Sequence, residues 1–168
     1  MSKSADPNHS RRRVEAAVVA LLTKRKKTLA LAESCTGGFI ANQITNVPGA
    51  SKVFTGGIVA YSNTVKVKLL GVNPETLKKH GAVSEAVARE MAIGAREKFG
   101  ADFAIAVTGV AGPSGGTKAK PVGTVFISIA GAFGTFVERR LNCYSRVKFK
   151  EITAQQALEM LCERLDCS

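Results

Sequence analysis

One segment of this 168-residue chain combines a nucleophilic side chain with backbone features that a reaction at a carbonyl group needs. The segment reads Glu33-Ser34-Cys35-Thr36-Gly37-Gly38 and directly follows a short apolar stretch. A serine at such a strand-to-helix corner lies near free N–H groups and the positive end of the helix dipole. These donors can bind a phosphate or carboxylate, or stabilise the oxyanion of an attacked carbonyl. A plain helix cap formed by Ser34 is the alternative interpretation.

A serine hydroxyl needs a base to take its proton before it can attack. The two histidines, His9 and His80, occupy no recognisable catalytic position, which argues against a Ser-His-Asp arrangement. A lysine can be the base when burial or neighbouring cations lower its pKa. Lys66 is the candidate, with Tyr61 five residues earlier as a proton relay, and we expect both at the end of a strand. Judged from composition alone, Lys66 would be a surface lysine.

A glycine-rich loop at residues 108–117 follows another apolar strand, the position at which loops bind ligands in open α/β sheets. The loop lacks the P-loop ending and the Gly-x-Gly-x-x-Gly fingerprint, so ATP and dinucleotide folds are not supported. Its glycines can present backbone donors to an anion, whereas a merely flexible connection is the alternative. The expected substrate contacts in this loop are Thr108, Gly109, Gly112, Gly115 and Gly116.

The elements that must position these residues follow from hydrophobic periodicity and turn signals. We expect helices at about 10–24 (capped by Ser10), 39–47, 84–99 and 146–165, and a short turn or helix starting at Asn73-Pro74. We expect strands at 28–32, 53–61, 103–107, 123–130 and 133–141, with the last two forming a hairpin. This order predicts a single-domain layered α/β/α fold with a mixed sheet, residues 11–168, after a disordered lead at residues 1–10.

Composition excludes several classes of protein. No apolar run approaches the roughly 18 residues that span a bilayer, and the N-terminus lacks the apolar core of a secretion signal. We therefore expect a cytoplasmic protein with no membrane partner. The four cysteines form no Cys-x-x-Cys pair, so unpaired thiols are expected and no metal site is predicted.

The net charge of +11 raises the question of a nucleic-acid partner. Residues 1–27 hold eight Lys/Arg and two acids, and the excess flanks one expected helix. No aromatic side chain is interleaved there to stack on bases, so a solvated face is favoured over a nucleic-acid patch. An anionic substrate would also suit a basic protein. Exposed sheet edges make a symmetric dimer the expected oligomer.

Six segments in fixed order resemble the CinA C-terminal domain family, from about residue 10 to 165. They are Glu-Ser-Cys-Thr-Gly-Gly, Tyr-Ser-Asn-x-x-Lys, Leu-Gly-Val, Gly-Ala-Val-Ser-Glu, Thr-Gly-x-Ala-Gly-Pro-x-Gly-Gly-Thr and Pro-Val-Gly-Thr-Val. Enzymatic members of that family deamidate nicotinamide mononucleotide. The resemblance implies that Ser34 is the nucleophile and Lys66 its base, with Tyr61 beside them. It places Thr108 at the start of the substrate loop and Arg146 against a pyridine nucleotide substrate, and it implies no cofactor.

The sequence departs from the family pattern near the expected phosphate contacts. The family's Gly-Asp-Arg reads Tyr144-Ser145-Arg146 here, an aspartate becomes Ser114, and an arginine four residues after Arg146 becomes Lys150. Lysine keeps the charge but loses the planar fork that suits phosphate. Two alternatives stay open: Cys35 as the nucleophile, and a catalytically silent domain that binds a nucleotide or docks a partner.

Overall fold

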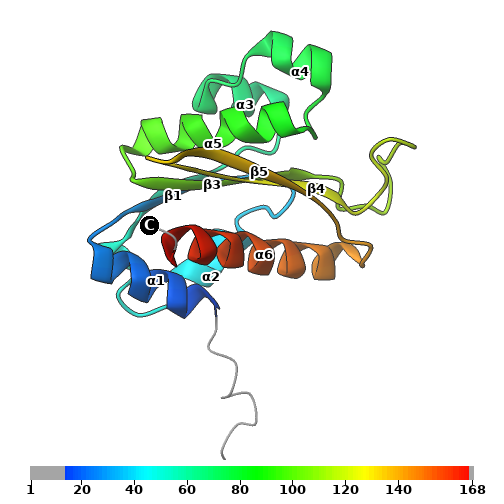
Figure 1. Cartoon of the computed structure of the whole chain (residues 1–168). Coiled ribbons are helices and arrows are strands. Elements are labelled where there is room, and N and C mark those ends of the chain that lie inside the picture. The colour runs from blue at the N-terminus through cyan, green and yellow to red at the C-terminus, as the bar shows by residue number, and fades with distance from the viewer. Residues whose placement is uncertain (1–13, 167–168) are drawn as a thin grey trace, which may run out of the picture.

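The computed structural model describes residues 14–166 as three layers, with a sheet between two sets of helices (Figure 1). One face of the sheet carries α1 (Val14–Arg25), α2 (Phe39–Thr45) and α6 (Arg146–Asp166). The other face carries α3 (Asn63–Leu70), α4 (Pro74–His80) and α5 (Glu85–Phe99). A short 3-10 turn, η1 (Ala50–Lys52), follows α2. The predicted layered α/β/α class is confirmed.

The five strands have the order β2-β1-β3-β4-β5. They are β1 (Leu29–Glu33), β2 (Phe54–Val59), β3 (Phe103–Gly109), β4 (Thr124–Gly131) and β5 (Gly134–Leu141). The first three are parallel, while β4 is antiparallel to β3 and to β5. The sheet is therefore mixed, and the hairpin turns between Gly131 and Gly134, as predicted.

The two faces of the sheet bury side chains of different size. On β1, Leu29 and Leu31 face the α1/α2/α6 layer, whereas Ala30 and Ala32 face the α5 layer. Strand β3 repeats this alternation, with Ile105 among the larger side chains. Because small residues line the α5 side, α5 can pack close to the sheet.

Helix α3, which carries Lys66, was not predicted from the sequence. Lys66 was expected at the end of the second strand, but β2 ends at Val59 and Lys66 lies in the middle of α3. The helix starts where the Ser62 hydroxyl accepts a hydrogen bond from the Val65 N–H, and it ends at Gly71 with φ +67°. Its mixed sequence lacks a clear apolar stripe, so these two caps were the signals available.

Helix α3 is held against α5 by a close backbone approach. A Cβ atom on Gly94 of α5 would lie 1.8 Å from the Leu70 carbonyl oxygen at the end of α3. Only glycine fits at this point, so the position of α3, and with it the position of Lys66, depends on Gly94.

Two sequence predictions for the N-terminal segment, the disordered lead at residues 1–10 and the Ser10 cap, lie outside the described residues.

Within residues 14–166, no helix is both long and apolar enough to cross a lipid bilayer.

Candidate active site

Three parallel strands end at the same edge of the sheet and bring their following residues together. Ser34 follows β1, Tyr61 lies two residues after β2, and Thr108 lies near the end of β3. The chain leaves β1 toward one face of the sheet and leaves β2 toward the other. Ligands in open α/β sheets bind at this kind of switch point. A cavity of about 230 Å³ lies here, lined by all three residues.

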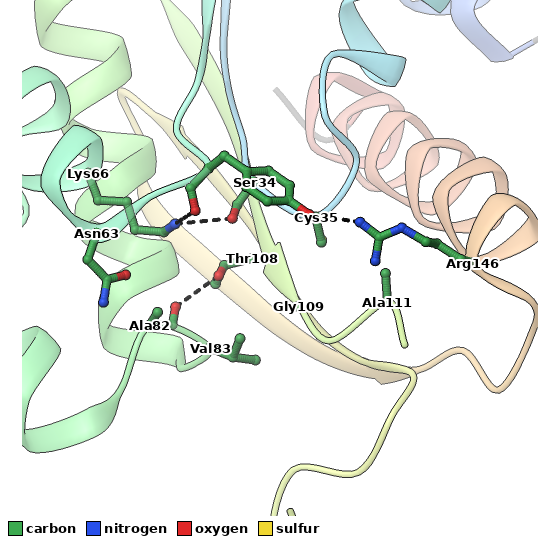
Figure 2. Close-up of a pocket in the computed structure, with 11 residues that line it drawn as sticks. Ser34, Cys35, Asn63, Lys66, Ala82, Val83, Thr108, Gly109, Ala111 and Arg146 are labelled. Atoms are coloured by element: carbon green, nitrogen blue, oxygen red, sulfur yellow. Dashed lines mark hydrogen bonds between the residues drawn. The ribbon is translucent and has the colours of Figure 1, made fainter. Parts of the chain in front are cut away.

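Ser34 and Lys66 meet in this cavity, although 32 residues separate them in the sequence (Figure 2). The Lys66 Nζ lies 3.1 Å from the Ser34 Oγ. The same Nζ lies 2.7 Å from the Ala60 carbonyl oxygen and 3.4 Å from the Tyr61 carbonyl oxygen. The amine is thus surrounded by two oxygens that can only accept hydrogen bonds and one hydroxyl that can also donate.

Lys66 is 1% exposed, which is unusual for a lysine. Burial lowers the pKa of its amine below the ordinary value of 10.5, because a desolvated ammonium ion loses hydration energy. A thiolate at Cys35 would oppose this shift. Among residues 14–166, none of the ion pairs includes Lys66. Burial therefore shifts the amine toward the neutral form, which a general base must have.

Cys35 lines the same cavity and is 6% exposed. Burial raises the pKa of its thiol to about 12, and the carboxylate of Glu33 adds to the rise. The N–H groups of Cys35 and Thr36 face the sulfur and favour its thiolate, but burial outweighs them. Cys35 is consequently a neutral thiol at pH 7 and leaves the pKa of Lys66 low.

The corner at residues 33–38 is built differently from the sequence prediction. The N–H groups of residues 35–38 were expected to be free for an anion. Instead, the buried Glu33 carboxylate accepts hydrogen bonds from the N–H groups of Gly38, Ile40 and Ala41, at 2.8–3.1 Å. The chain's own carboxylate therefore fills the N-terminal end of α2, where a helix favours negative charge. The prediction is therefore wrong for the Gly38 N–H.

Two more residues of the corner also turn away from the cavity. The Thr36 hydroxyl donates to Glu33 at 2.6 Å, and the Gly37 N–H donates to the Ser34 carbonyl at 3.2 Å. Thr36, Gly37 and Gly38 do not line the cavity, whereas Ser34 and Cys35 do. The part of the corner that lines the cavity is therefore Ser34 and Cys35, the first two residues after β1.

Tyr61 and Arg146 are joined across the mouth of the cavity, and both line it. One Arg146 nitrogen lies 2.7 Å from the Tyr61 hydroxyl, and the other lies 2.9 Å from the Gly112 carbonyl oxygen. The Tyr61 hydroxyl thus accepts from Arg146, while Tyr61 contacts Lys66 through its backbone carbonyl. This geometry does not support the expected relay through the tyrosine hydroxyl.

The glycine-rich loop contributes only its first part to the cavity. Thr108, Gly109 and Ala111 line it, and the Gly112 carbonyl holds Arg146 at its edge. A Cβ on Gly109 would lie 2.7 Å from the Thr124 carbonyl oxygen, so glycine is required there for packing. Gly115 and Gly116 are exposed and do not line the cavity. Their expected substrate contacts stay a prediction.

Sequence reasoning missed some of the residues that line the cavity. Asn63 comes from the start of α3, and Ala82 and Val83 come from the turn before α5. These residues fall within the Tyr-Ser-Asn-x-x-Lys and Gly-Ala-Val-Ser-Glu segments, so the signal was present but carried no chemistry by itself. In the part of the chain that the structure describes, no group of three His, Cys, Asp or Glu residues could hold a metal ion.

The chain is similar to proteins of one family over almost its whole length. Residues 11–165 match the CinA C-terminal domain. A CinA-like protein of Thermotoga maritima is 60% identical over 117 residues, 70% of this chain and 29% of that protein. A CinA-like protein of Synechocystis sp. is 46% identical over 162 residues, 92% of this chain and 38% of that protein. The chain spans about a third of the length of these curated relatives.

Solved structures show the same fold. The competence/damage inducible protein of Agrobacterium tumefaciens superposes with a TM-score of 0.87 at 39% identity, covering 91% of this chain and 93% of that one. A CinA superfamily protein of Klebsiella pneumoniae superposes with a TM-score of 0.89 at 33% identity, covering 92% and 97%. The sequence match and the shared fold agree, and the chain belongs to the CinA C-terminal domain family.

Proposed function

We propose that this chain is an amidohydrolase that converts nicotinamide mononucleotide to nicotinic acid mononucleotide and ammonia through a Ser–Lys acyl-enzyme. The observation that carries the proposal is the 3.1 Å approach of the Lys66 Nζ to the Ser34 Oγ in a cavity where the lysine is 1% exposed. A nucleophile within hydrogen-bond reach of a base is the arrangement that covalent catalysis needs. Membership in the CinA family supports the choice of substrate.

The partners of the Lys66 amine support its role as the base. A neutral amine has two hydrogens and one lone pair. The carbonyls of Ala60 and Tyr61 accept hydrogen bonds, so they can hold the two hydrogens. The lone pair then points to the Ser34 hydroxyl and accepts its proton.

The reaction runs in two steps. Ser34 Oγ forms a bond to the carboxamide carbon as its proton passes to Lys66. The proposed oxyanion donor is the N–H group of Cys35, which lines the cavity and whose present partner, a neutral thiol, is a weak acceptor. The C–N bond then breaks as Lys66 returns the proton to the nitrogen, which leaves as ammonia. A water molecule then attacks the acyl carbon and gives a proton to Lys66. Lys66 passes this proton to the Ser34 Oγ as the bond between that oxygen and the acyl carbon breaks, which releases the acid and the free serine.

The phosphate is assigned to cations on α6. Arg146 and Lys150 lie one helical turn apart on this helix, and both can offer charge to the anion. The Lys150 Nζ lies 3.8 Å from where a Cβ of Gly37 would be, close to the corner that carries Ser34. Since lysine lacks the planar fork of an arginine, we expect Lys150 to bind the phosphate less tightly than an arginine at this position would.

The test is ammonia release from nicotinamide mononucleotide by the wild type, Ser34→Ala and Cys35→Ala. We expect Ser34→Ala to lose about 10⁴-fold or more in kcat, because the nucleophile is gone. Cys35→Ala is the matched control and should stay within about tenfold, because the thiol is neutral. Loss of activity in Cys35→Ala alone would contradict the serine mechanism. Tight binding of the nucleotide by the wild type without product would favour the catalytically silent alternative.

A further inference from the structure

Two residues that line the cavity, Thr108 and Ala82, are joined by a hydrogen bond of fixed direction. Thr108, near the end of β3, is 1% exposed, and its Oγ1 lies 2.8 Å from the Ala82 carbonyl oxygen (Figure 2). Thr108 and Ala82 both line the cavity that holds Ser34 and Lys66. The mechanism above uses neither of them.

The position of the threonine proton follows from its partner. A threonine hydroxyl has one hydrogen and two lone pairs, whereas a carbonyl oxygen can only accept. The hydrogen of Thr108 therefore lies toward the Ala82 oxygen. To any group inside the cavity, Thr108 offers lone pairs and no hydrogen. This stretch of wall accepts hydrogen bonds and does not donate them.

The sheet register brings this acceptor next to the nucleophile. Glu33 of β1 pairs with Val107 of β3, so the next residues along the two parallel strands, Ser34 and Thr108, are neighbours. The Ser34 N–H donates to the Val107 carbonyl at 3.1 Å, which holds the two strand ends together. A carbonyl carbon bonded to the Ser34 Oγ therefore lies within reach of Thr108.

We propose that the Thr108 Oγ1 accepts a hydrogen bond from the nitrogen of the substrate carboxamide, which makes the site selective for the amide over its acid product. This inference rests on the proposed amidohydrolase function. With the carboxamide oxygen on the N–H group of Cys35, the nitrogen is the part left to meet an acceptor. Its hydrogens suit the lone pairs of Thr108.

The acid product cannot form the hydrogen bond to Thr108 that the amide substrate forms. After the C–N bond breaks and water has supplied the new C–O bond, the product is a carboxylate, which has no hydrogen to donate. Its oxygen then faces the lone pairs of Thr108 and the Ala82 carbonyl. A buried site built to pair with an N–H group discriminates strongly against a ligand that lacks one. The wall thus holds the substrate and favours release of the product.

The experiment measures the affinity of both nucleotides by calorimetry in protein that cannot turn over. Ser34→Ala is combined with Thr108→Val, which keeps the shape but removes the acceptor, or with Thr108→Ser, which keeps the hydroxyl. We expect Ser34→Ala to bind nicotinamide mononucleotide at least about tenfold more tightly than nicotinic acid mononucleotide. Adding Thr108→Val should bring this ratio close to one, whereas Thr108→Ser should preserve it.

Several outcomes decide between the inference and the function on which it rests. An unchanged ratio in the Thr108→Val protein overturns the inference. A ratio close to one in the Thr108→Ser protein also overturns it, because this variant keeps the hydroxyl. Binding of neither nucleotide by Ser34→Ala protein, together with no ammonia release by the wild type, overturns the proposed function and the inference with it. Ammonia release with an unchanged ratio overturns the inference alone. If Thr108→Val does not fold, product inhibition of the wild type decides: an inhibition constant for the acid as low as the KM for the amide overturns the inference.

Discussion

At the scale of single residues, the protonation state of one amine decides what the site can do. Lys66 has three oxygen neighbours, and an ammonium ion could donate to all of them. An ammonium ion has no lone pair and could not take the Ser34 proton. Burial of Lys66 favours the neutral form, and burial of Cys35 keeps a competing negative charge away. Desolvation of two neighbouring side chains thus supports the same chemistry.

The protonation of Lys66 predicts how activity depends on pH. The base works only when neutral, so kcat/KM for ammonia release should rise with pH through the native pKa of Lys66, which lies below 10.5. Lys66→Arg stays protonated and should lose about 10²-fold or more in activity, because arginine cannot act as a base here. The measurement is a pH–rate profile of ammonia release.

The control for this prediction lies on the same helix. Lys68 is exposed on α3, and Lys68→Arg should keep both the rate and the profile of the wild type. An active Lys66→Arg protein with an unchanged profile would show that another group is the base.

At the scale of elements, the short helix α2 is held by an internal anion. The Glu33 carboxylate is 2% exposed and receives four hydrogen bonds, three from backbone N–H groups around the start of α2 and one from the Thr36 hydroxyl. These contacts join the last residue of β1 to the first turn of α2 across the loop that carries Ser34. Glu33 therefore positions Ser34, the proposed nucleophile, although Glu33 does not line the cavity.

Replacing this anion should loosen the corner. Glu33→Gln keeps the shape but exchanges one acceptor oxygen for an N–H₂ group that faces other donors. We expect a loss of about 2 kcal/mol in the free energy of unfolding, because buried donors are left unpaired. Urea unfolding checks the value. Glu97→Gln, at an exposed position of α5, should change it by less than about 0.5 kcal/mol, and equal effects of both substitutions would argue against the corner as described.

At the scale of the whole molecule, contacts between segments distant in the sequence hold together the strands that position the site. Asp102 lies just before β3, and Lys27 and Thr28 lie just before β1. Asp102 accepts hydrogen bonds from the Lys27 Nζ at 2.8 Å and from the Thr28 N–H at 2.9 Å. These contacts link positions 74 or 75 residues apart and fix the start of the two strands whose far ends carry Ser34 and Thr108. The expected dimer stays a prediction at this scale.

The Asp102 contacts predict an acid-dependent part of stability. Burial tends to raise the pKa of Asp102, but hydrogen bonds from Lys27 and Thr28 outweigh it and hold the pKa below its ordinary 3.8. The stabilisation is therefore fully present at pH values above the pKa of Asp102 in the unfolded chain. It is lost as the pH falls through the lower pKa of Asp102 in the folded protein. Asp102→Asn should lower the free energy of unfolding by about 1 kcal/mol at pH 7. On acidification, the free energy of unfolding of this variant should fall less than that of the wild type.

Urea unfolding at pH 7 and at pH values from 4 downward provides the measurement. Glu163→Gln, at an exposed position of α6, is the control and should follow the wild type at each pH. An Asp102→Asn protein that loses as much stability as the wild type on acidification would contradict this assignment.

Much of the fold could be predicted because its signals are local. Ser84 before α5, Asn73-Pro74 at the start of α4 and the glycines of the hairpin are short-range signals, and each element lies where it was expected. Helix α3 was missed because its lysines and β-branched residues give no apolar stripe. Its caps, Ser62 and Gly71, were local signals, but without an apolar stripe between them they did not predict a helix.

The sequence by itself determined the order of the elements other than α3, the serine at a strand-to-helix corner and a lysine as the candidate base. Only the tertiary structure decided which groups meet: Lys66 with Ser34, Glu33 with the N-terminal end of α2, and Thr108 with Ala82. The physical reason is that propensities and caps act over a few residues. Burial, pKa and the direction of a hydroxyl proton depend on packing between segments that are 26 or 32 residues apart.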